Sequence, residues 1–164
     1  MSACRSALSR AIHPVLALFI AVAALVGVQA APASTPSAHA SVLTLGRRAV
    51  LVASWQRGKP YRYGAAGPRA FDCSGLVKYT YARLGHYLPH NSYLQYLRTR
   101  HLTHAQMRPG DLIFMNVNGG GIRGIDHVGI YAGHGYWWVA RHTGTVITKQ
   151  RLWTSRYWVG RVRA

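Results

Sequence analysis

Apolar residues recur at helical spacing in two segments near the middle of this chain. Residues 43–55 carry them on one side of an expected helix, and Gly58 and Pro60 end the segment. Residues 71–84 show a second such pattern, followed by Gly85, a residue type that commonly ends a helix. The pattern therefore predicts two helices separated by a loop.

A glycine-rich loop and a shorter helix complete this part of the pattern. The loop covers residues 61–69 and reads YRYGAAGPR. Residues 91–98 predict a third, short helix, in which Ser92 and Gln95 have the spacing of a capping box.

The pattern changes to short strands after Pro109 and Gly110. Residues 116–124 hold four Gly and two Asn and predict a loop. Apolar, β-branched or aromatic runs predict five strands, at residues 111–115, 127–132, 136–141, 145–150 and 157–163. Helices followed by consecutive strands indicate one α+β domain with an antiparallel sheet.

The first forty residues have the composition of a secretory signal peptide and a spacer. Arg5 and Arg10 precede an uninterrupted apolar run over residues 15–28, and small residues follow it. Cleavage is expected after Ala30 or Ala40. The apolar run is shorter than the roughly 20 residues that cross a bilayer, although an uncleaved membrane anchor stays open as an alternative. We therefore predict export.

The exported part, residues 41–164, is expected to form one domain with a single cysteine. Cys4 is lost with the signal, so Cys73 has no partner for an intramolecular disulfide. The loss of Arg5 and Arg10 also lowers the formal net charge from +17 to +15. A lone thiol in an exported protein is either buried and inert or reactive, and both interpretations are open at this point.

Acidic residues are scarce enough to exclude several chemistries. Against 20 Lys and Arg, the chain has three acidic residues, Asp72, Asp111 and Asp126. A glycosidase generally needs two carboxylates around one bond, and a calcium or magnesium site needs several. Neither class fits, and no metal or other cofactor is expected. Seventeen of the basic residues are Arg, whose guanidinium group suits phosphate or carboxylate partners.

Cys73 stands where a nucleophilic cysteine is expected. It follows the predicted N-cap Asp72 and so occupies the first turn of the second helix, where backbone N–H groups and the helix dipole stabilise a thiolate. Ser74 and Gly75 are small and leave the sulfur accessible. We therefore predict a reactive Cys73 with a lowered thiol pKa.

A thiol nucleophile needs a base, and position must choose among nine histidines. His127 opens a predicted strand directly after Asp126 and is the best candidate, whereas His134 lies in a glycine turn. Polar connecting segments predict solvated surface positions for His86, His90, His101 and His104. From the residues alone, a metal-binding or structural role for His127 stays open.

Five short motifs occur in a fixed order between residues 49 and 147. They read Tyr-Gly, Phe-Asp-Cys-Ser-Gly-Leu-Val, Leu-Pro, Pro-Gly-Asp-Leu and Asp-His-Val-Gly-Ile-Tyr, and all three Asp residues lie inside them. In this combination and order they resemble the NlpC-type peptidoglycan peptidases, which are small papain-like cysteine peptidases of bacterial cell walls.

The resemblance implies a papain-like α+β fold, with the nucleophile at a helix start and an antiparallel sheet after the helices. Cys73 matches the family's nucleophile and His127 its general base. Tyr61, Asp72 and Ser74 match residues of the substrate-binding site and the nucleophile motif. The implied reaction is hydrolysis of amide bonds in peptidoglycan stem peptides, commonly between D-glutamate (through its γ-carboxyl) and a diamino acid.

The third catalytic position departs from the family pattern. The family usually carries a polar residue, commonly His, twelve positions after the base, where it orients the imidazole. Here that position is Val139, which cannot accept a hydrogen bond. His142 is a nearby substitute, but strand alternation places it on the opposite face from Val139 unless a bulge intervenes. The third member of the site therefore stays open.

The expected partners follow from the resemblance and from the charge. Peptidoglycan stem peptides are the expected substrate, and the positive charge favours anionic cell-wall polymers. No nucleic acid is expected, because no motif that binds it is present. We expect a monomer that is secreted or associated with the cell wall. Two alternatives stay open, a non-catalytic or weakly active peptidoglycan-binding protein on the same fold and a papain-like acyltransferase.

Overall fold

The computed structural model describes residues 43–163 of the 164. The predicted signal peptide and spacer, residues 1–40, lie outside the described residues. Within the described part, no helix is both long enough and apolar enough to cross a bilayer.

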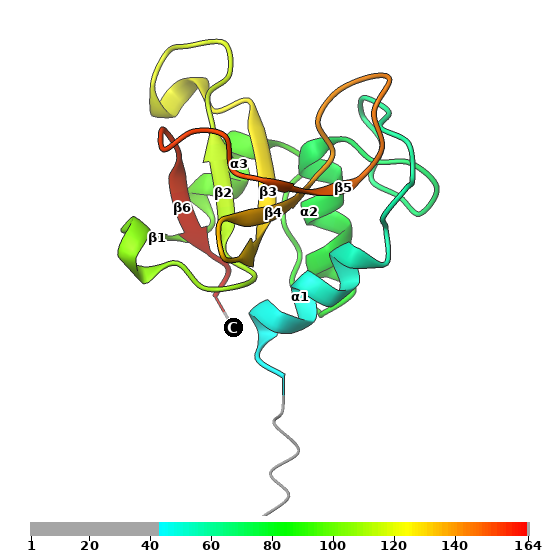
Figure 1. Ribbon diagram of the computed structural model, residues 1–164, viewed down its shortest axis with the longest axis horizontal. Helices are drawn as coiled ribbons and strands as arrows, with labels where there is room; N and C mark the ends of the chain where they lie inside the picture. The colour runs from blue at the N-terminus through cyan, green and yellow to red at the C-terminus, as the bar shows by residue number, and fades with distance from the viewer. Residues whose placement is uncertain (1–42, 164) are drawn as a thin grey trace, which may run out of the picture. The chain divides into compact units, whose positions relative to one another are not determined.

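Three helices come first in this part of the chain (Figure 1), and they are α1 (Leu45–Ser54), α2 (Cys73–Ala82) and α3 (Ser92–Leu97). Each lies inside the range predicted for it. Thr44 caps α1, where its hydroxyl accepts from the Arg47 N–H at 3.4 Å. Asp72 caps α2 as predicted and accepts from the Gly75 N–H at 2.6 Å. The chain turns away after α2 at Gly85, whose φ of 87° is a conformation that favours glycine.

The capping box predicted for the third helix is wrong. The N-cap of α3 is Asn91, whose side chain accepts from the Leu94 N–H at 2.9 Å. Because Asn91 takes the cap one residue earlier, the Ser92 hydroxyl is directed inward and donates to the Ile125 carbonyl at 3.1 Å. The Gln95 side chain is fully buried and contacts other segments of the chain.

Six strands form one antiparallel sheet in the order β1-β6-β2-β3-β4-β5. Their bounds are β1 (Arg100–Leu102), β2 (Leu112–Met115), β3 (His127–Gly133), β4 (Tyr136–Val139), β5 (Thr148–Arg151) and β6 (Trp158–Arg161). Figure 1 shows β6, the last strand in the chain, between β1 and β2. The prediction of an α+β fold with helices ahead of an antiparallel sheet is confirmed.

Three short elements escaped the sequence pattern. β1 was not predicted, because its three residues are polar or partly exposed and pair with β6 without any apolar alternation. Two single-turn 3₁₀ helices, η1 (His104–Gln106) and η2 (Ile122–Gly124), were also missed, the second inside the predicted glycine-rich loop.

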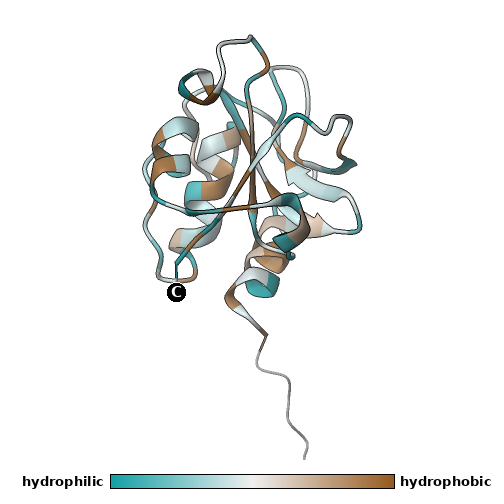
Figure 2. Cartoon of the chain, turned by 90° about the vertical axis from the view of Figure 1, so that its left-hand side faces the viewer, coloured by the Kyte–Doolittle hydropathy of each residue, from teal (hydrophilic) through white to brown (hydrophobic). Residues whose placement is uncertain are grey.

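The sheet separates two groups of buried side chains. Val128 and Ile130 on β3 pack with the helices in the larger group. Tyr131 on β3 and Trp137 and Val139 on β4 belong to a smaller group on the opposite face, as strand alternation requires. Figure 2 shows apolar segments running along the strands at the centre of the domain.

The start of α2 is held by close backbone packing against the preceding loop. α2 packs on β3 and on α1. A Cβ atom added to Gly75 would lie 2.1 Å from the Ala65 carbonyl oxygen, so the loop reaches α2 only because Gly75 has no side chain. This contact places the loop beside the first turn of α2, which also contains Cys73.

Replacing Gly75 with alanine is expected to destabilise the domain by about 1–3 kcal/mol, the usual cost of overpacking. The added methyl group would meet rigid backbone at Ala65 rather than a movable side chain. Urea unfolding followed by circular dichroism measures the change. Lys78→Ala, at an exposed position of the same helix, is the matched control and should shift the free energy of unfolding by less than about 0.5 kcal/mol. Equal shifts in the two variants would show that the close approach carries no stability.

Candidate active site

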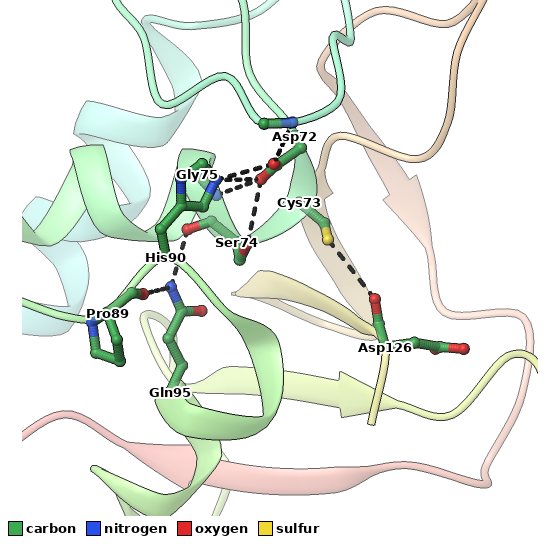
Figure 3. A network of polar contacts seen from close by, with 9 residues as sticks. Asp72, Cys73, Ser74, Gly75, Pro89, His90, Gln95 and Asp126 are labelled. Carbon is green, nitrogen blue, oxygen red and sulfur yellow. Dashed lines mark hydrogen bonds and ion pairs between the residues drawn. The ribbon is translucent and has the colours of Figure 1, made fainter. Parts of the chain in front are cut away.

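Cys73 begins α2, and its sulfur lies against the start of β3. The thiol donates to the Asp126 carbonyl oxygen at a distance of 3.8 Å (Figure 3). The Val128 backbone N–H also lies close enough to the sulfur to lower its pKa. These two contacts come from the residues immediately before and after His127. The packing of α2 on β3 therefore sets Cys73 against the backbone on either side of His127. The His127 ring itself packs on Trp137 and is not among the residues that line the cleft beside the sulfur, so the pairing of Cys73 with His127 stays a prediction.

The carboxylate of Asp72 is the centre of a hydrogen-bond network at the helix start (Figure 3). It accepts from the backbone N–H groups of Gly75 at 2.6 Å and Gly64 at 2.9 Å, and from the Ser74 hydroxyl at 3.1 Å. His90 Nε2 lies 2.9 Å from both carboxylate oxygens. Asp72 thus joins the first turn of α2 to the preceding loop and to the segment before α3.

The structure corrects the expectation for His90. The sequence placed it on the solvated surface, because it lies in a polar connecting segment. In the fold this segment passes the N-terminus of α2, and His90 forms an ion pair with Asp72 when its ring is protonated. No pattern in the sequence pairs residues 72 and 90, since the contact depends on how α3 packs.

Gln95 is a second site residue that sequence reasoning missed. Its Nε2 donates to the Ser74 carbonyl at 2.9 Å and to the Pro89 carbonyl at 2.7 Å (Figure 3). The side chain is fully buried, so both bonds are shielded from water. Gln95 therefore ties the first turn of α2 to the segment that carries His90. The only signal in the sequence was a Gln within the predicted short helix, and the sequence pattern assigned that Gln to a capping box.

A cleft of about 430 Å³ opens beside Cys73. It takes in the predicted site residues Tyr61, Asp72 and Ser74, together with His90. The complete lining is Tyr61, Tyr63, Gly64, Asp72, Cys73, Ser74, His90, Asn91, Ser92, Ile125 and Asp126. Burial, helped by the negative charges of Cys73 and Asp72, raises the pKa of Tyr61, so its hydroxyl stays protonated.

The thiol is less acidic than the sequence analysis predicted. Burial and, to a smaller extent, the negative charge of Asp72 raise the pKa of Cys73 to about 11. The backbone N–H groups of Val128, Ser74 and Cys73 lower this pKa, as expected at a helix N-terminus, but burial outweighs them. The prediction of a lowered thiol pKa is therefore wrong. Burial destabilises the thiolate more than the backbone N–H groups at the start of the helix stabilise it.

His127 is buried as well, and its charged form is disfavoured. Burial lowers the pKa of His127 to about 4, and the positive charges of Arg141 and His142 also lower it. The carboxylate of Asp126 acts in the opposite direction. At neutral pH the resting pair is a protonated thiol and a neutral imidazole. A neutral imidazole is a base that can accept the thiol proton when a substrate is attacked.

Packing against Trp137 orients the His127 ring. The two ring centroids are 5.6 Å apart and the planes meet at 84°. Among residues 43–163, no side chain forms a hydrogen bond with the His127 ring that shifts its pKa. Trp137 is fully buried, and its indole N–H has no acceptor within the same part of the chain.

Neither candidate for the third position donates or accepts at the His127 ring. Val139 is fully buried in the smaller apolar group together with Trp137. His142 lies beyond the end of β4, where it is exposed and its Nδ1 contacts the Thr143 carbonyl at 2.8 Å. The irregularity in this hairpin falls on β3, just before Gly133, so the bulge that would turn His142 toward the site is not at the end of β4.

The first turn of α2 also offers donors for a developing negative charge. Within residues 43–163, the backbone N–H groups of Cys73 and Ser74 have no oxygen acceptor and act on the Cys73 sulfur, whereas that of Gly75 is taken by Asp72. A thiol, a neutral imidazole and two such N–H groups are the parts needed for acyl transfer through a thioester. In the same part of the chain, no group of three His, Cys or Asp residues could hold a metal ion.

A model of the NlpC/P60 family matches residues 58–163, which is most of the part that the structure describes. The chain belongs to the NlpC/P60 family. The match confirms the resemblance that the five motifs carried and, with it, the papain-like arrangement of helices and sheet.

Named relatives agree in family and differ in length. A probable endopeptidase p60 of Listeria innocua is 45% identical over 87 residues, which are 52% of this chain and 18% of the relative. A probable endopeptidase of Corynebacterium glutamicum is 33% identical over 124 residues, 75% of this chain and 56% of the relative. The structure of the peptidoglycan hydrolase RipB from Mycobacterium tuberculosis superposes with a TM-score of 0.63 at 30% identity, covering 72% of this chain and 64% of that one. The chain therefore covers 18% to 64% of the length of these three proteins.

Buried His127 is expected to make the domain sensitive to acid. An unfolded chain takes up a proton on this histidine below pH 6.5, whereas the folded domain does so only near pH 4, so the free energy of unfolding falls as the pH drops through this window. The loss amounts to about 3 kcal/mol. Chemical unfolding of the wild type and of His127→Gln at pH 7 and pH 4 measures it.

The glutamine variant lacks the titrating group and should lose about 3 kcal/mol less than the wild type over this pH range. His86→Gln, outside the site, is the control and should keep the wild-type pH dependence. If His127→Gln shows the same loss of stability as the wild type, His127 is not held neutral by burial.

The third position can be tested by supplying the missing polar group. Val139→His is expected to raise kcat several-fold, because Val139 lies on the same side of the sheet as Trp137, against which His127 packs. His142→Ala should leave kcat within about twofold, since His142 bonds to Thr143 instead. The two variants are assayed side by side on one purified muropeptide. A large loss in His142→Ala would assign the orienting role to His142 and overturn this interpretation.

Proposed function

We propose that this protein is an exported cysteine endopeptidase that hydrolyses amide bonds in peptidoglycan stem peptides. The observation that carries the proposal is the position of Cys73 at the start of α2, on the wall of the cleft and between the peptide groups that flank His127. Membership of the NlpC/P60 family and relatives named as endopeptidases support the same activity.

The first half of the reaction transfers an acyl group to Cys73. Because the resting thiol is protonated, His127 accepts its proton as the sulfur attacks the amide carbonyl. The N–H groups of Cys73 and Ser74 stabilise the oxyanion that forms. His127 then gives the proton to the departing amine, the C–N bond breaks, and a thioester remains on Cys73.

The second half returns the enzyme to its starting state. A water molecule attacks the thioester while His127 accepts one of its protons. The C–S bond breaks, the carboxylic acid product leaves, and the proton restores the Cys73 thiol. The same two residues therefore serve both halves, and no other reactant than water is consumed.

The cleft favours a substrate that carries carboxylates. The Asp72 carboxylate is already occupied by four donors. The Asp126 carboxylate is occupied by the preceding loop, where it accepts from the Val117 N–H at 2.9 Å and from the backbone N–H and the side-chain amide of Asn118. The hydroxyl groups of Tyr61 and Tyr63 are left to face the substrate mainly as donors. Such a cleft suits the bond between D-glutamate, linked through its γ-carboxyl, and a diamino acid, because the D-glutamate keeps a free α-carboxylate.

One observation favours a weaker activity than that of family members with a polar residue at the third position. An apolar Val139 at the third position leaves His127 oriented by Trp137 rather than by a hydrogen bond. A catalytic histidine without an orienting partner can lose orders of magnitude in rate. A weakly active or purely peptidoglycan-binding protein is therefore the second candidate.

The test is mass analysis of purified muropeptides after incubation with the exported domain. Hydrolysis adds the mass of one water across the products, whereas acyl transfer produces a new conjugate. Cys73→Ala should lower the rate by on the order of 10³-fold or more while the circular dichroism spectrum stays unchanged. Unchanged muropeptides with the wild type, together with retained binding to cell-wall sacculi, would select the binding protein. Full activity in Cys73→Ala would overturn the mechanism.

A further inference from the structure

A second pocket lies at the other end of α2 from Cys73. It has a volume of about 410 Å³, within the range of roughly 300–1,000 Å³ that is usual for ligand sites. Tyr81, near the C-terminal end of α2, lines this pocket, whereas Cys73 at the N-terminal end lines the cleft. Tyr81 lies eight positions after Cys73 on the helix, a rise of about 12 Å along the axis.

Four arginines are among the residues that line this pocket. Arg100, Arg108, Arg161 and Arg163 all line it, against a single acidic residue, Asp111. They come from β1, the turn before β2 and the end of β6, so three separate segments supply the charge. In Figure 1 the start of α1 and the C-terminal end of the described chain lie close together at the base of the domain, where this pocket is formed.

The one carboxylate in the pocket is already neutralised. Asp111 is buried and accepts two hydrogen bonds from Arg161, at 2.6 and 2.8 Å. It also accepts from the Arg108 backbone N–H at 2.7 Å. This leaves the guanidinium groups of Arg100, Arg108 and Arg163, which form no ion pair or side-chain hydrogen bond within residues 43–163. Within the part of the chain that the structure describes, three of the arginines that line the pocket therefore have no acidic partner.

The floor of the pocket is rigid backbone. Thr44, Leu45 and Gly46 at the start of α1 line it, so the positive end of that helix dipole faces the same space. A Cβ atom on Gly46 would lie 2.2 Å from the Pro109 carbonyl oxygen, and one on Gly110 would lie 2.1 Å from Gly46 Cα. Two glycines thus allow α1 to sit directly on the turn before β2.

We propose that this pocket binds a phosphate group carried by an anionic polymer of the cell envelope. Three arginines without an acidic partner line one cavity, and their forked guanidinium groups suit the several oxygens of a phosphate, which accept paired N–H bonds. Because the pocket and the cleft lie at opposite ends of α2, a bound polymer leaves the cleft open to a stem peptide. The site provides attachment, and the cleft provides the reaction.

The test compares two triple variants that remove the same charge. The pocket variant removes the three arginines that have no acidic partner, by Arg100→Gln, Arg108→Gln and Arg163→Gln. Arg57→Gln, Arg98→Gln and Arg151→Gln are the control, because these exposed residues line neither the pocket nor the cleft. Calorimetry measures binding of a synthetic glycerol phosphate oligomer, inorganic phosphate and vesicles containing phosphatidylglycerol, all at about 0.15 M salt, where exposed charges are largely screened.

We expect the pocket variant to bind the oligomer at least tenfold more weakly and the control variant to change less than twofold. A triple Arg→Lys variant at the pocket positions checks that charge alone is not enough, and it should recover only part of the affinity. Equal losses in the pocket and control variants, or no oligomer binding by the wild type, would overturn the proposal. Binding to the vesicles and not to the oligomer would also overturn it, by assigning the phosphate to a lipid. Cleavage of a small soluble muropeptide should be unchanged in every variant, which separates this site from the catalytic one.

Discussion

Asp72 is the residue on which both the start of α2 and the cleft depend. A buried carboxylate is costly unless every oxygen is hydrogen-bonded, and here four donors from three segments converge on it. One donor is the Gly75 N–H, which makes Asp72 the N-cap of α2. The others tie the preceding loop and His90 to the same point. The cost of burying one charge is thus offset only when the loop, the first turn of α2 and the segment before α3 come together.

The local features of this site could be predicted from sequence, whereas its long-range contacts could not. The sequence pattern at residues 72–75 predicts that Asp72 caps the second helix, because capping depends on about four neighbouring residues. It follows that Cys73 lies in the first turn. The His90 contact and the inward turn of Gln95 depend on how α3 packs, which no local pattern encodes. β1 was missed for a related reason, since a short polar edge strand has no apolar alternation and is formed only by its pairing with β6.

The error in the thiol pKa has a physical lesson. A helix N-terminus always favours a negative charge, and sequence reveals such a position reliably. Whether the thiolate forms at rest depends also on burial, which sequence does not give. Here burial shifts the pKa values of Cys73 and His127 in opposite directions, and both shifts favour the neutral pair. In the proposed reaction, the two groups become charged together at the moment of attack.

α2 connects this chemistry to the rest of the domain. Its N-terminal end carries Cys73, the proposed nucleophile, and its C-terminal end is fixed by a hydrogen bond from the buried Tyr81 hydroxyl to the Gly110 carbonyl. Gly110 belongs to the turn that packs on α1 and precedes Asp111, the partner of Arg161. The motif Pro-Gly-Asp-Leu therefore holds the C-terminal end of α2, which lies away from Cys73. The same turn forms the floor of the arginine-lined pocket, so the contacts that hold α2 in place also hold that pocket open.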